Sequence, residues 1–264
     1  MPLLFRYQRT MKMNRDNLIE YLKNFSIEKP YVNAMWLEGA DGIGRVDEYS
    51  DIDFWFDVEK SHQESFLQEC VAELAKLAPI DSRVDEIRPV IAQSNIHLEN
   101  TSEYLTLDIC VQSHEIRGME VTCYAENDIA ELPYVLFDKK HIISFYKYEV
   151  DKEKISCDLE DSRNKLLQMG RVTKYIKRGQ YLEAYMKYVE NIVEPLVKTA
   201  RLLHTPKHYE YGLCHISHHL PAEAVSELEP LYKMTSLEDI EKNLVTAKRL
   251  FENYEKKLNE KYQL

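Results

Sequence analysis

The stretch from Gly39 to Asp53 reads GADGIGRVDEYSDID, in which a glycine-rich polar segment leads to two aspartates separated by one residue. From Asp51 to Val58 polar and apolar side chains alternate strictly, which predicts a strand with one buried face. Asp51 and Asp53 share the other face, about 6.6 Å apart at roughly 3.3 Å of rise per residue. Two carboxylates placed in this way can bind divalent cations together.

A second alternating segment supplies a third aspartate. In residues 104–111 apolar side chains alternate with polar ones, and Asp108 falls on the polar face. Carboxylates suit Mg²⁺, which binds through a few of them plus substrate phosphates and keeps several waters. The pattern predicts a magnesium site of Asp51, Asp53 and Asp108 that serves phosphoryl chemistry.

The glycine-rich segment supplies candidate contacts to a nucleotide. Its glycines permit close backbone approach, so that amide N–H groups can contact triphosphate oxygens. A basic cluster that contains Lys174 is either a solvated helix face or a further contact to the triphosphate. The candidate nucleotide-binding residues are Gly39, Ala40, Asp41, Arg45, Ser50 and Lys174.

Two further residues share the polar face of the first strand. Trp55 is expected either to stack on a base or sugar ring or to pack against the helical domain. Asp57 lies one step further along the strand, and we expect it to be solvated.

Composition narrows the class of protein. The chain has 264 residues, which suggests two domains, and 44% hydrophobic with 30% charged residues is typical of globular proteins. No apolar run approaches the roughly 18 residues that cross a bilayer, and the apolar patch near the N-terminus is too short for a signal peptide. The five cysteines, an odd number without a CxxC pair, argue against a disulfide framework and a zinc ribbon. We therefore expect a cytoplasmic protein without a membrane partner.

The charge balance bears on partners. With 34 basic and 45 acidic residues the net charge is −11, which disfavours nucleic acid and favours a small cationic substrate. The acidic excess can equally serve solubility alone. The oligomeric state is left open.

The remaining patterns predict an α+β chain. Residues 1–150 mix strand patterns, among them 34–37 and 90–98, with two helical stripes: one holds Leu18 and Leu22, the other follows a capping box of Ser61 and Glu64. Residues 151–264 show only helical spacing and predict a helical bundle. Its helices are expected over 158–178, ended by Gly179, over 181–203, kinked by Pro195, and from Ser236 to the C-terminus.

The loop, the DxD pair and the third aspartate together resemble the signature of the nucleotidyltransferase superfamily with the DNA polymerase beta-like fold. A mixed sheet with flanking helices, followed by a helical domain, is similar to the aminoglycoside and lincosamide nucleotidyltransferases. The segments VLFDKK at Val135–Lys140 and YIKRGQY at Tyr175–Tyr181 also resemble stretches of those enzymes.

The resemblance implies magnesium-dependent transfer of a nucleoside monophosphate, AMP from ATP, to a hydroxyl of a small molecule such as an aminoglycoside or lincosamide antibiotic. Asp51 and Asp53 would bind metal, and Asp108 would be a third ligand or the general base, with Glu103 as the alternative base. Ala40 stands where the family has a serine, so a hydroxyl that would hydrogen-bond a phosphate is missing. The alternatives are an antitoxin-type nucleotidyltransferase that modifies a protein, and a nucleotide-binding protein without catalysis.

Overall fold

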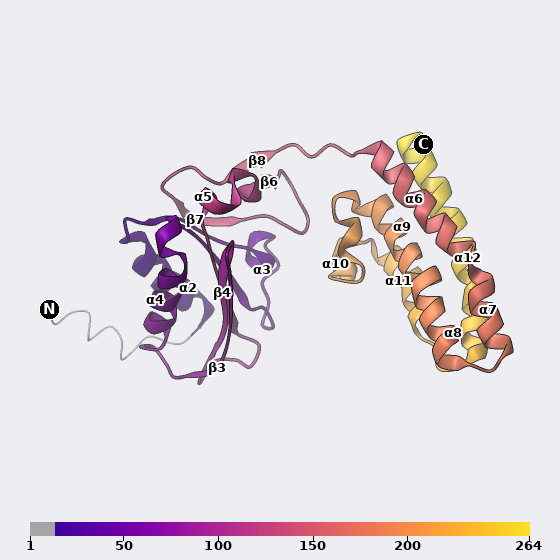
Figure 1. Ribbon diagram of the computed structural model, residues 1–264, viewed down its shortest axis with the longest axis horizontal. Coiled ribbons are helices and arrows are strands. Elements are labelled where there is room, and N and C mark those ends of the chain that lie inside the picture. The colour runs from indigo at the N-terminus through magenta and orange to yellow at the C-terminus, as the bar shows by residue number, and fades with distance from the viewer. Residues whose placement is uncertain (1–13) are drawn as a thin grey trace. The chain divides into compact units, whose positions relative to one another are not determined.

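The computed structural model describes residues 14–264 as an α+β chain (Figure 1), which confirms the predicted fold class. The chain divides into two compact units, one that ends at Tyr148 and one that comprises Glu149–Leu264. The first unit contains the strands and the second is helical.

A six-stranded mixed sheet forms the first unit, in the order β3-β4-β5-β2-β1-β7. β2 and β5 pair in parallel and all other neighbours are antiparallel. The central place of β2 and β5 sets the two strands that carry the aspartates side by side. The strands are β1 (Val32–Leu37), β2 (Ile52–Val58), β3 (Ile80–Arg88), β4 (Ile91–Leu98), β5 (Thr106–Gln112) and β7 (Tyr134–Asp138).

Two helices cover one face of this sheet, α2 (Arg15–Ile27) and α4 (Gln63–Leu74), as Figure 1 shows. Their stripes pack with the apolar side chains of β2 into one core, where Phe54, Phe56 and Phe66 have no exposed surface. Burying each such side chain contributes about 1.5–3 kcal/mol. The predicted stripes of both helices and of β2 are confirmed.

Two local expectations in this unit are corrected. Ser61 does not cap α4, because a short 3₁₀ turn, η1 (Lys60–His62), precedes the helix and leaves His62 at the N-cap. β3 has no counterpart among the predicted strands. Almost all of its residues are exposed on both faces, so its sequence carries no apolar alternation.

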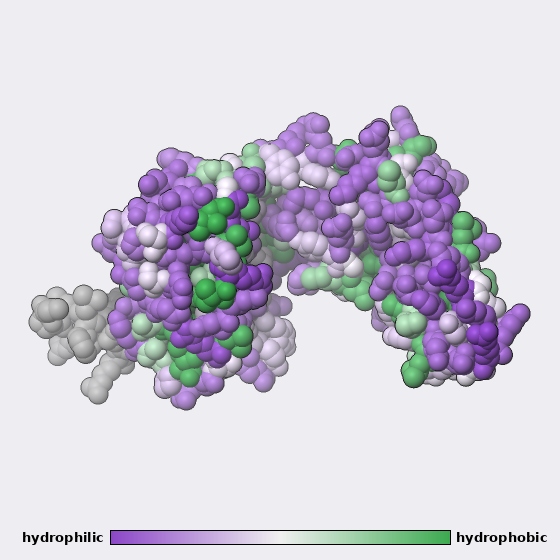
Figure 2. All heavy atoms as spheres, in the orientation of Figure 1, coloured by the Kyte–Doolittle hydropathy of each residue, from purple (hydrophilic) through white to green (hydrophobic). Residues whose placement is uncertain are grey.

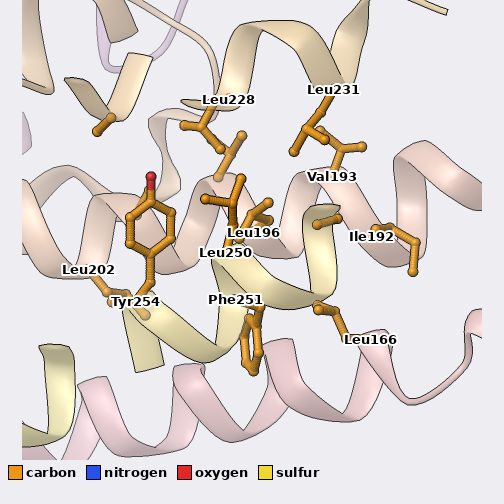
Figure 3. Packing of buried hydrophobic residues seen from close by; sticks show 14 of the residues in the cluster. Leu166, Ile192, Val193, Leu196, Leu202, Leu228, Leu231, Leu250, Phe251 and Tyr254 are labelled. Carbon is orange, nitrogen blue, oxygen red and sulfur yellow. The ribbon is translucent and has the colours of Figure 1, made fainter. Parts of the chain in front are cut away.

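The second unit packs its helices around a separate core. Leu196, Leu231 and Tyr254, from three different helices, belong to one cluster of buried side chains, part of which Figure 3 shows, and are almost fully buried. The helices are α6 (Lys152–Leu166), α7 (Met169–Lys177), α8 (Tyr181–Tyr188), α9 (Glu194–His204), α10 (Ile216–His219), α11 (Ala222–Tyr232) and α12 (Leu237–Tyr262), with a π turn, η3 (Val189–Val193), and a 3₁₀ turn, η4 (Pro206–Tyr211).

The helix predicted over 158–178 is two helices, because the chain leaves helical geometry at Gln168 and Gly170 adds no side chain to hold the next turn. Gly179 ends α7 as expected: its φ is +67°, and Gln180 N–H donates to the Tyr175 carbonyl at 3.0 Å. The kink expected at Pro195 appears as the π turn just before it, because a proline ring clashes with the carbonyl four residues earlier. Ser236 caps α12 by accepting from Asp239 N–H at 3.1 Å, as predicted.

The visible surface is largely hydrophilic. On the face that Figure 2 shows, hydrophilic residues predominate on both units and hydrophobic ones are scattered. Among the described residues, no helix combines the length and the apolar character that a membrane crossing requires.

Candidate active site

The aspartates lie on the face of the sheet opposite α2 and α4, which we call the carboxylate face. Asp53 on β2 is the direct partner of Asp108 on β5 in the parallel register. On the other side, Glu38 follows β1, and its N–H donates to the Asp53 carbonyl at 3.1 Å. Glu38, Asp53 and Asp108 therefore form a row across neighbouring strands, with Asp51 two residues before Asp53 and exposed.

Negative charge is concentrated in this row. The pKa of Asp53 is raised to about 7, first by burial and then by the charges of Asp51 and Asp108. Burial also raises the pKa of Asp108 and that of Glu38. Such a cluster favours the binding of a cation, because a cation relieves the repulsion among the carboxylates.

Asp108 is held in place by a residue that the sequence patterns did not single out. The side-chain amide of Gln93 on β4 donates to both carboxylate oxygens of Asp108, at 2.9 and 2.8 Å. These hydrogen bonds lower the pKa of Asp108 against the effect of burial.

The glycine-rich segment is a single helical turn, α3 (Gly39–Gly42), instead of the expected open loop. Gly39 has a φ of +55°, and a Cβ atom there would lie 2.0 Å from Oδ2 of Asp53. A Cβ atom on Gly42 would lie 1.7 Å from the backbone oxygen of Leu132. Both positions require glycine, the first because the backbone approaches a candidate metal ligand.

Arg15 connects this segment to the aspartates and was not foreseen. Its guanidinium contacts the Asp41 carboxylate and donates to the backbone oxygens of Ser50, at 3.1 Å, and of Asp51. Asp41, a candidate nucleotide contact, is thus an ion-pair partner of Arg15. No local signal marks Arg15, which lies 36 residues before Asp51.

The other candidate nucleotide-binding residues differ in their environments. Ala40 is half-buried and its carbonyl accepts from the N–H of Arg45, whose side chain is exposed. The Ser50 hydroxyl donates to Asp47. Lys174 lies exposed on α7 in the helical unit, 4.9 Å from the centre of the Tyr175 ring.

Glu103 lines a shallow pocket of about 480 Å³ beyond Asp108, together with His97 of β4 and Thr106 of β5. Its side chain is exposed. Glu103 is thus exposed to solvent, whereas Asp108 lies within the row of carboxylates.

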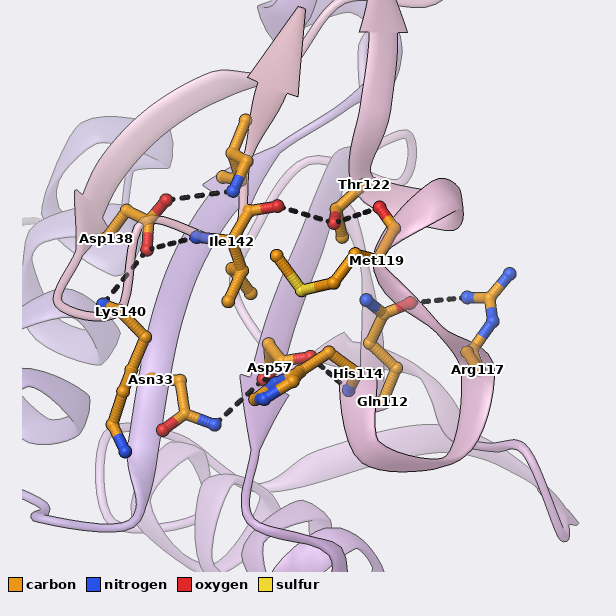
Figure 4. A network of polar contacts seen from close by, with 11 residues as sticks. Asn33, Asp57, Gln112, His114, Arg117, Met119, Thr122, Asp138, Lys140 and Ile142 are labelled. Atoms are coloured by element: carbon orange, nitrogen blue, oxygen red, sulfur yellow. Dashed lines mark hydrogen bonds and ion pairs between the residues drawn. The ribbon is translucent and has the colours of Figure 1, made fainter.

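The expectation that Asp57 is solvated is wrong. Its side chain is fully buried, and its carboxylate accepts from Asn33 Nδ2 at 2.8 Å and from both Nδ1 and the backbone N–H of His114 at 2.7 Å (Figure 4). His114 begins the short helix α5 (His114–Arg117), which continues into η2 (Met119–Thr122). Asp57 therefore anchors α5 to the sheet. The alternation along β2 cannot show that a later segment, α5, buries this carboxylate.

The residues fit a hard divalent cation. Asp51, Asp53 and Asp108 offer only carboxylate oxygens, and the strongest influences on Asp53 after burial are all acidic groups. The arrangement can hold a magnesium ion together with phosphate oxygens next to α3.

Comparison of the sequence with family models and with curated proteins finds no match. Among solved structures, the chain is similar to an aminoglycoside 6-adenyltransferase from Bacillus subtilis, at 14% identity and a TM-score of 0.40, over 94% of this chain and 91% of that one. It is also similar to a nucleotidyltransferase-like protein from Exiguobacterium sibiricum 255-15, at 11% identity and a TM-score of 0.32, over 93% and 76% of the two chains.

Proposed function

We propose that this chain is a magnesium-dependent nucleotidyltransferase, which transfers AMP from ATP to a hydroxyl of a small molecule. The proposal rests on Asp53 and Asp108, which are direct partners on neighbouring parallel strands. Asp51 lies two residues before Asp53, and the backbone at Gly39 closely approaches the Asp53 carboxylate. Acidic residues crowded in this way destabilise each other unless a cation is bound, which argues against a purely structural role.

Asp51, Asp53 and Asp108 would hold the metal. Bound there, Mg²⁺ would neutralise charge on the phosphoryl oxygens. The chain contributes the remaining parts. Gly39 lets the backbone of α3 approach the Asp53 carboxylate, Arg15 ties α3 to the backbone at Asp51, and Gln93 orients Asp108.

The acceptor hydroxyl attacks the α-phosphorus, pyrophosphate leaves, and a carboxylate takes the hydroxyl proton. Asp108 is the first candidate for this base, because it stands in the row next to Asp53. Glu103, exposed beyond Asp108, is the second.

A small hydroxylated acceptor with positive charge fits the acidic site and the net charge of −11. We include aminoglycoside and lincosamide antibiotics in this class, which would make the chain a cytoplasmic resistance enzyme. A protein side chain is the alternative acceptor. Ala40 motivates the other alternative, a protein that binds a nucleotide without turnover.

Pyrophosphate release tests the proposal. The purified chain is incubated with ATP, Mg²⁺ and a panel of hydroxylated acceptors. Pyrophosphate release is followed, and the mass of each acceptor product is measured by mass spectrometry. We expect release that needs both Mg²⁺ and an acceptor, with a mass gain of one AMP on the acceptor. Asp53→Asn should abolish release, whereas Glu64→Gln, exposed on α4 across the sheet, should not change it. In a second assay the chain is added to a cell lysate with labelled ATP, and label on a protein band would favour the protein-modifying alternative. ATP binding without pyrophosphate release under any condition would contradict turnover.

A further inference from the structure

The loop between β4 and β5, residues 99–105, is held by one histidine near the end of β4. Nδ1 of His97 lies 2.7 Å from Oδ1 of Asp81 on β3, and its Nε2 lies 3.0 Å from the backbone oxygen of Ser102 in the loop. The hydroxyl oxygen of Thr101, also in the loop, lies 3.3 Å from Nε2. One imidazole ring thus joins β3, β4 and the loop.

All three of these oxygens act as acceptors. The carboxylate of Asp81 and the carbonyl of Ser102 have no hydrogen to donate. The Thr101 hydroxyl donates its hydrogen to the Leu98 carbonyl at 2.7 Å, so it can only accept from His97. A neutral imidazole has one N–H group and one lone pair, and in either tautomer the lone pair would face an oxygen. Only the imidazolium, with two N–H groups, donates on both sides of the ring.

The surroundings of the ring favour the protonated form. The Ser102 carbonyl, and after it the Asp81 carboxylate, raise the pKa of His97 above its ordinary value of 6.5. Its neighbours in the sheet, Ser82 on β3 and Thr106 on β5, are uncharged. The His97 side chain is 19% exposed, so it can exchange its proton with solvent.

The loop that His97 holds borders the carboxylate face. Glu103, the second candidate for the general base, lines the pocket of about 480 Å³ together with His97. The next residue, Tyr104, contacts Tyr49 edge to face, with ring centres 5.1 Å apart. Tyr49 lies two residues before Asp51. The position of the loop therefore affects both a candidate base and the segment that leads to a candidate metal ligand.

Loss of the proton would weaken the loop at its centre. The Ser102 carbonyl accepts from His97 and also from the N–H of Leu105, at 2.9 Å. If the remaining proton stays on Nδ1, the Nε2 lone pair faces this carbonyl, and if it stays on Nε2, the Nδ1 lone pair faces the Asp81 carboxylate. Either tautomer loses a hydrogen bond of the charge-assisted kind, which is roughly twice as strong as a neutral one.

We propose that protonated His97 is a clasp that holds the β4–β5 loop to β3, and that a rise in pH releases the loop together with Glu103 and Tyr104. The clasp comprises His97, Asp81 and Ser102, and it does not depend on the proposed function. Because the folded state binds the proton more tightly, the stabilisation is present in full below the ordinary pKa of 6.5 and is lost as the pH rises through the higher folded pKa.

Two measurements on the full chain between about pH 5 and 9 test the clasp. Histidine resonances in NMR spectra report the protonation of His97, and hydrogen exchange, corrected for its intrinsic pH dependence, reports the protection of amides 102–106. His97→Gln removes the titrating group, and Asp81→Asn keeps the shape of its partner without the charge. His62→Gln, at a histidine 3.9 Å from a glutamate on η1, and Asp85→Asn, elsewhere on β3, are the matched controls.

We expect wild-type protection to fall about threefold or more as the pH rises, with a midpoint that coincides with the titration of His97. In His97→Gln protection should be low at every pH, and in Asp81→Asn the midpoint should move down by about half a pH unit or more. The controls should keep the wild-type midpoint. Protection that stays constant while His97 titrates, a fall that His97→Gln retains, or an unmoved midpoint in Asp81→Asn would overturn the clasp. If His97→Gln does not fold, the midpoint in Asp81→Asn decides alone.

Discussion

Gly39 and Asp53 are in such close approach that a side chain on the one would displace the carboxylate of the other. In Gly39→Ala the new Cβ atom would meet Oδ2 of Asp53 at 2.0 Å in a left-handed backbone conformation. Gly44→Ala is the matched control, since Gly44 also has a positive φ, of +67°, but nothing within 4 Å of the added atom. The left-handed conformation alone costs about 1–2 kcal/mol for alanine.

We therefore expect Gly44→Ala to lower the free energy of unfolding by about that amount and to leave ATP affinity unchanged. Gly39→Ala should lower stability further and weaken magnesium-dependent ATP binding. Urea unfolding and calorimetry on both variants measure the difference. Equal effects of the two substitutions would show that the contact with Asp53 is unimportant.

Asp53 should make stability depend on pH when no magnesium is present. Its folded pKa, about 7, lies above the ordinary value of 3.8, so the folded state binds the proton more tightly. The resulting stabilisation is complete below about pH 4 and is lost as the pH rises through 7. Urea unfolding in EDTA between pH 4 and 8 should show this loss in the wild type and much less of it in Asp53→Asn. At neutral pH the variant should be at least as stable as the wild type. If the free energy of unfolding changed with pH in the same way in both proteins, the raised pKa of Asp53 would be contradicted.

The residues that sequence patterns identified are those with a local signal. Asp51, Asp53 and Asp108 stand out through a period of two along their own strands. Glu38, Gln93 and Arg15 did not stand out, because their roles depend on the pairing of β1 with β2 and of β4 with β5 and on a contact between distant segments.

Among the secondary-structure elements, the start of α5 is anchored to the sheet by a buried carboxylate. Asp57 accepts three hydrogen bonds, two of them from His114 at the start of α5. Asp57→Asn replaces an acceptor oxygen by a donor amide that faces donors. We expect the free energy of unfolding to fall by at least about 2 kcal/mol, because hydrogen bonds to a charged group contribute roughly 1.5–3 kcal/mol each.

Asp53→Asn, the same chemical change four residues earlier on β2, is the control, and its effect on stability should be neutral or opposite. Urea unfolding at pH 7 in EDTA compares the two. A loss of stability of the same size in both variants would contradict the different roles given to these aspartates.

Elements with a strong period were predicted from sequence, and elements without one were not. α2, α4, β2 and α12 each bury one clean stripe, so their periods of 3.6 and 2 are visible. β3 buries almost nothing, and the turn between α6 and α7 occurs within a continuous helical pattern. β3 is held by its backbone pairing with β4, which no period in its own sequence reveals.

At the scale of the whole molecule, each unit has a hydrophobic core of its own. The residues that connect them, 147–151, have no regular structure and are largely exposed. Limited proteolysis should therefore cut first at this connection, with trypsin at Lys147 or a glutamyl endopeptidase at Glu149, and leave two resistant fragments. Mass spectrometry of the early products identifies the cut. Early cleavage within α9 or α12, at the same rate as at the connection, would contradict two independent cores.

The proposed function requires that Asp51, Asp53 and Asp108 bind a nucleotide through magnesium. Calorimetric titration of a non-hydrolysable ATP analogue, with and without Mg²⁺, tests it most directly in the wild type, Asp53→Asn, Asp108→Asn and the control Glu64→Gln. We expect binding that requires Mg²⁺, survives in the control and weakens at least about a hundredfold in both aspartate variants, the equivalent of roughly 2.7 kcal/mol. Binding that is independent of Mg²⁺, or that both aspartate variants retain at wild-type strength, would contradict it.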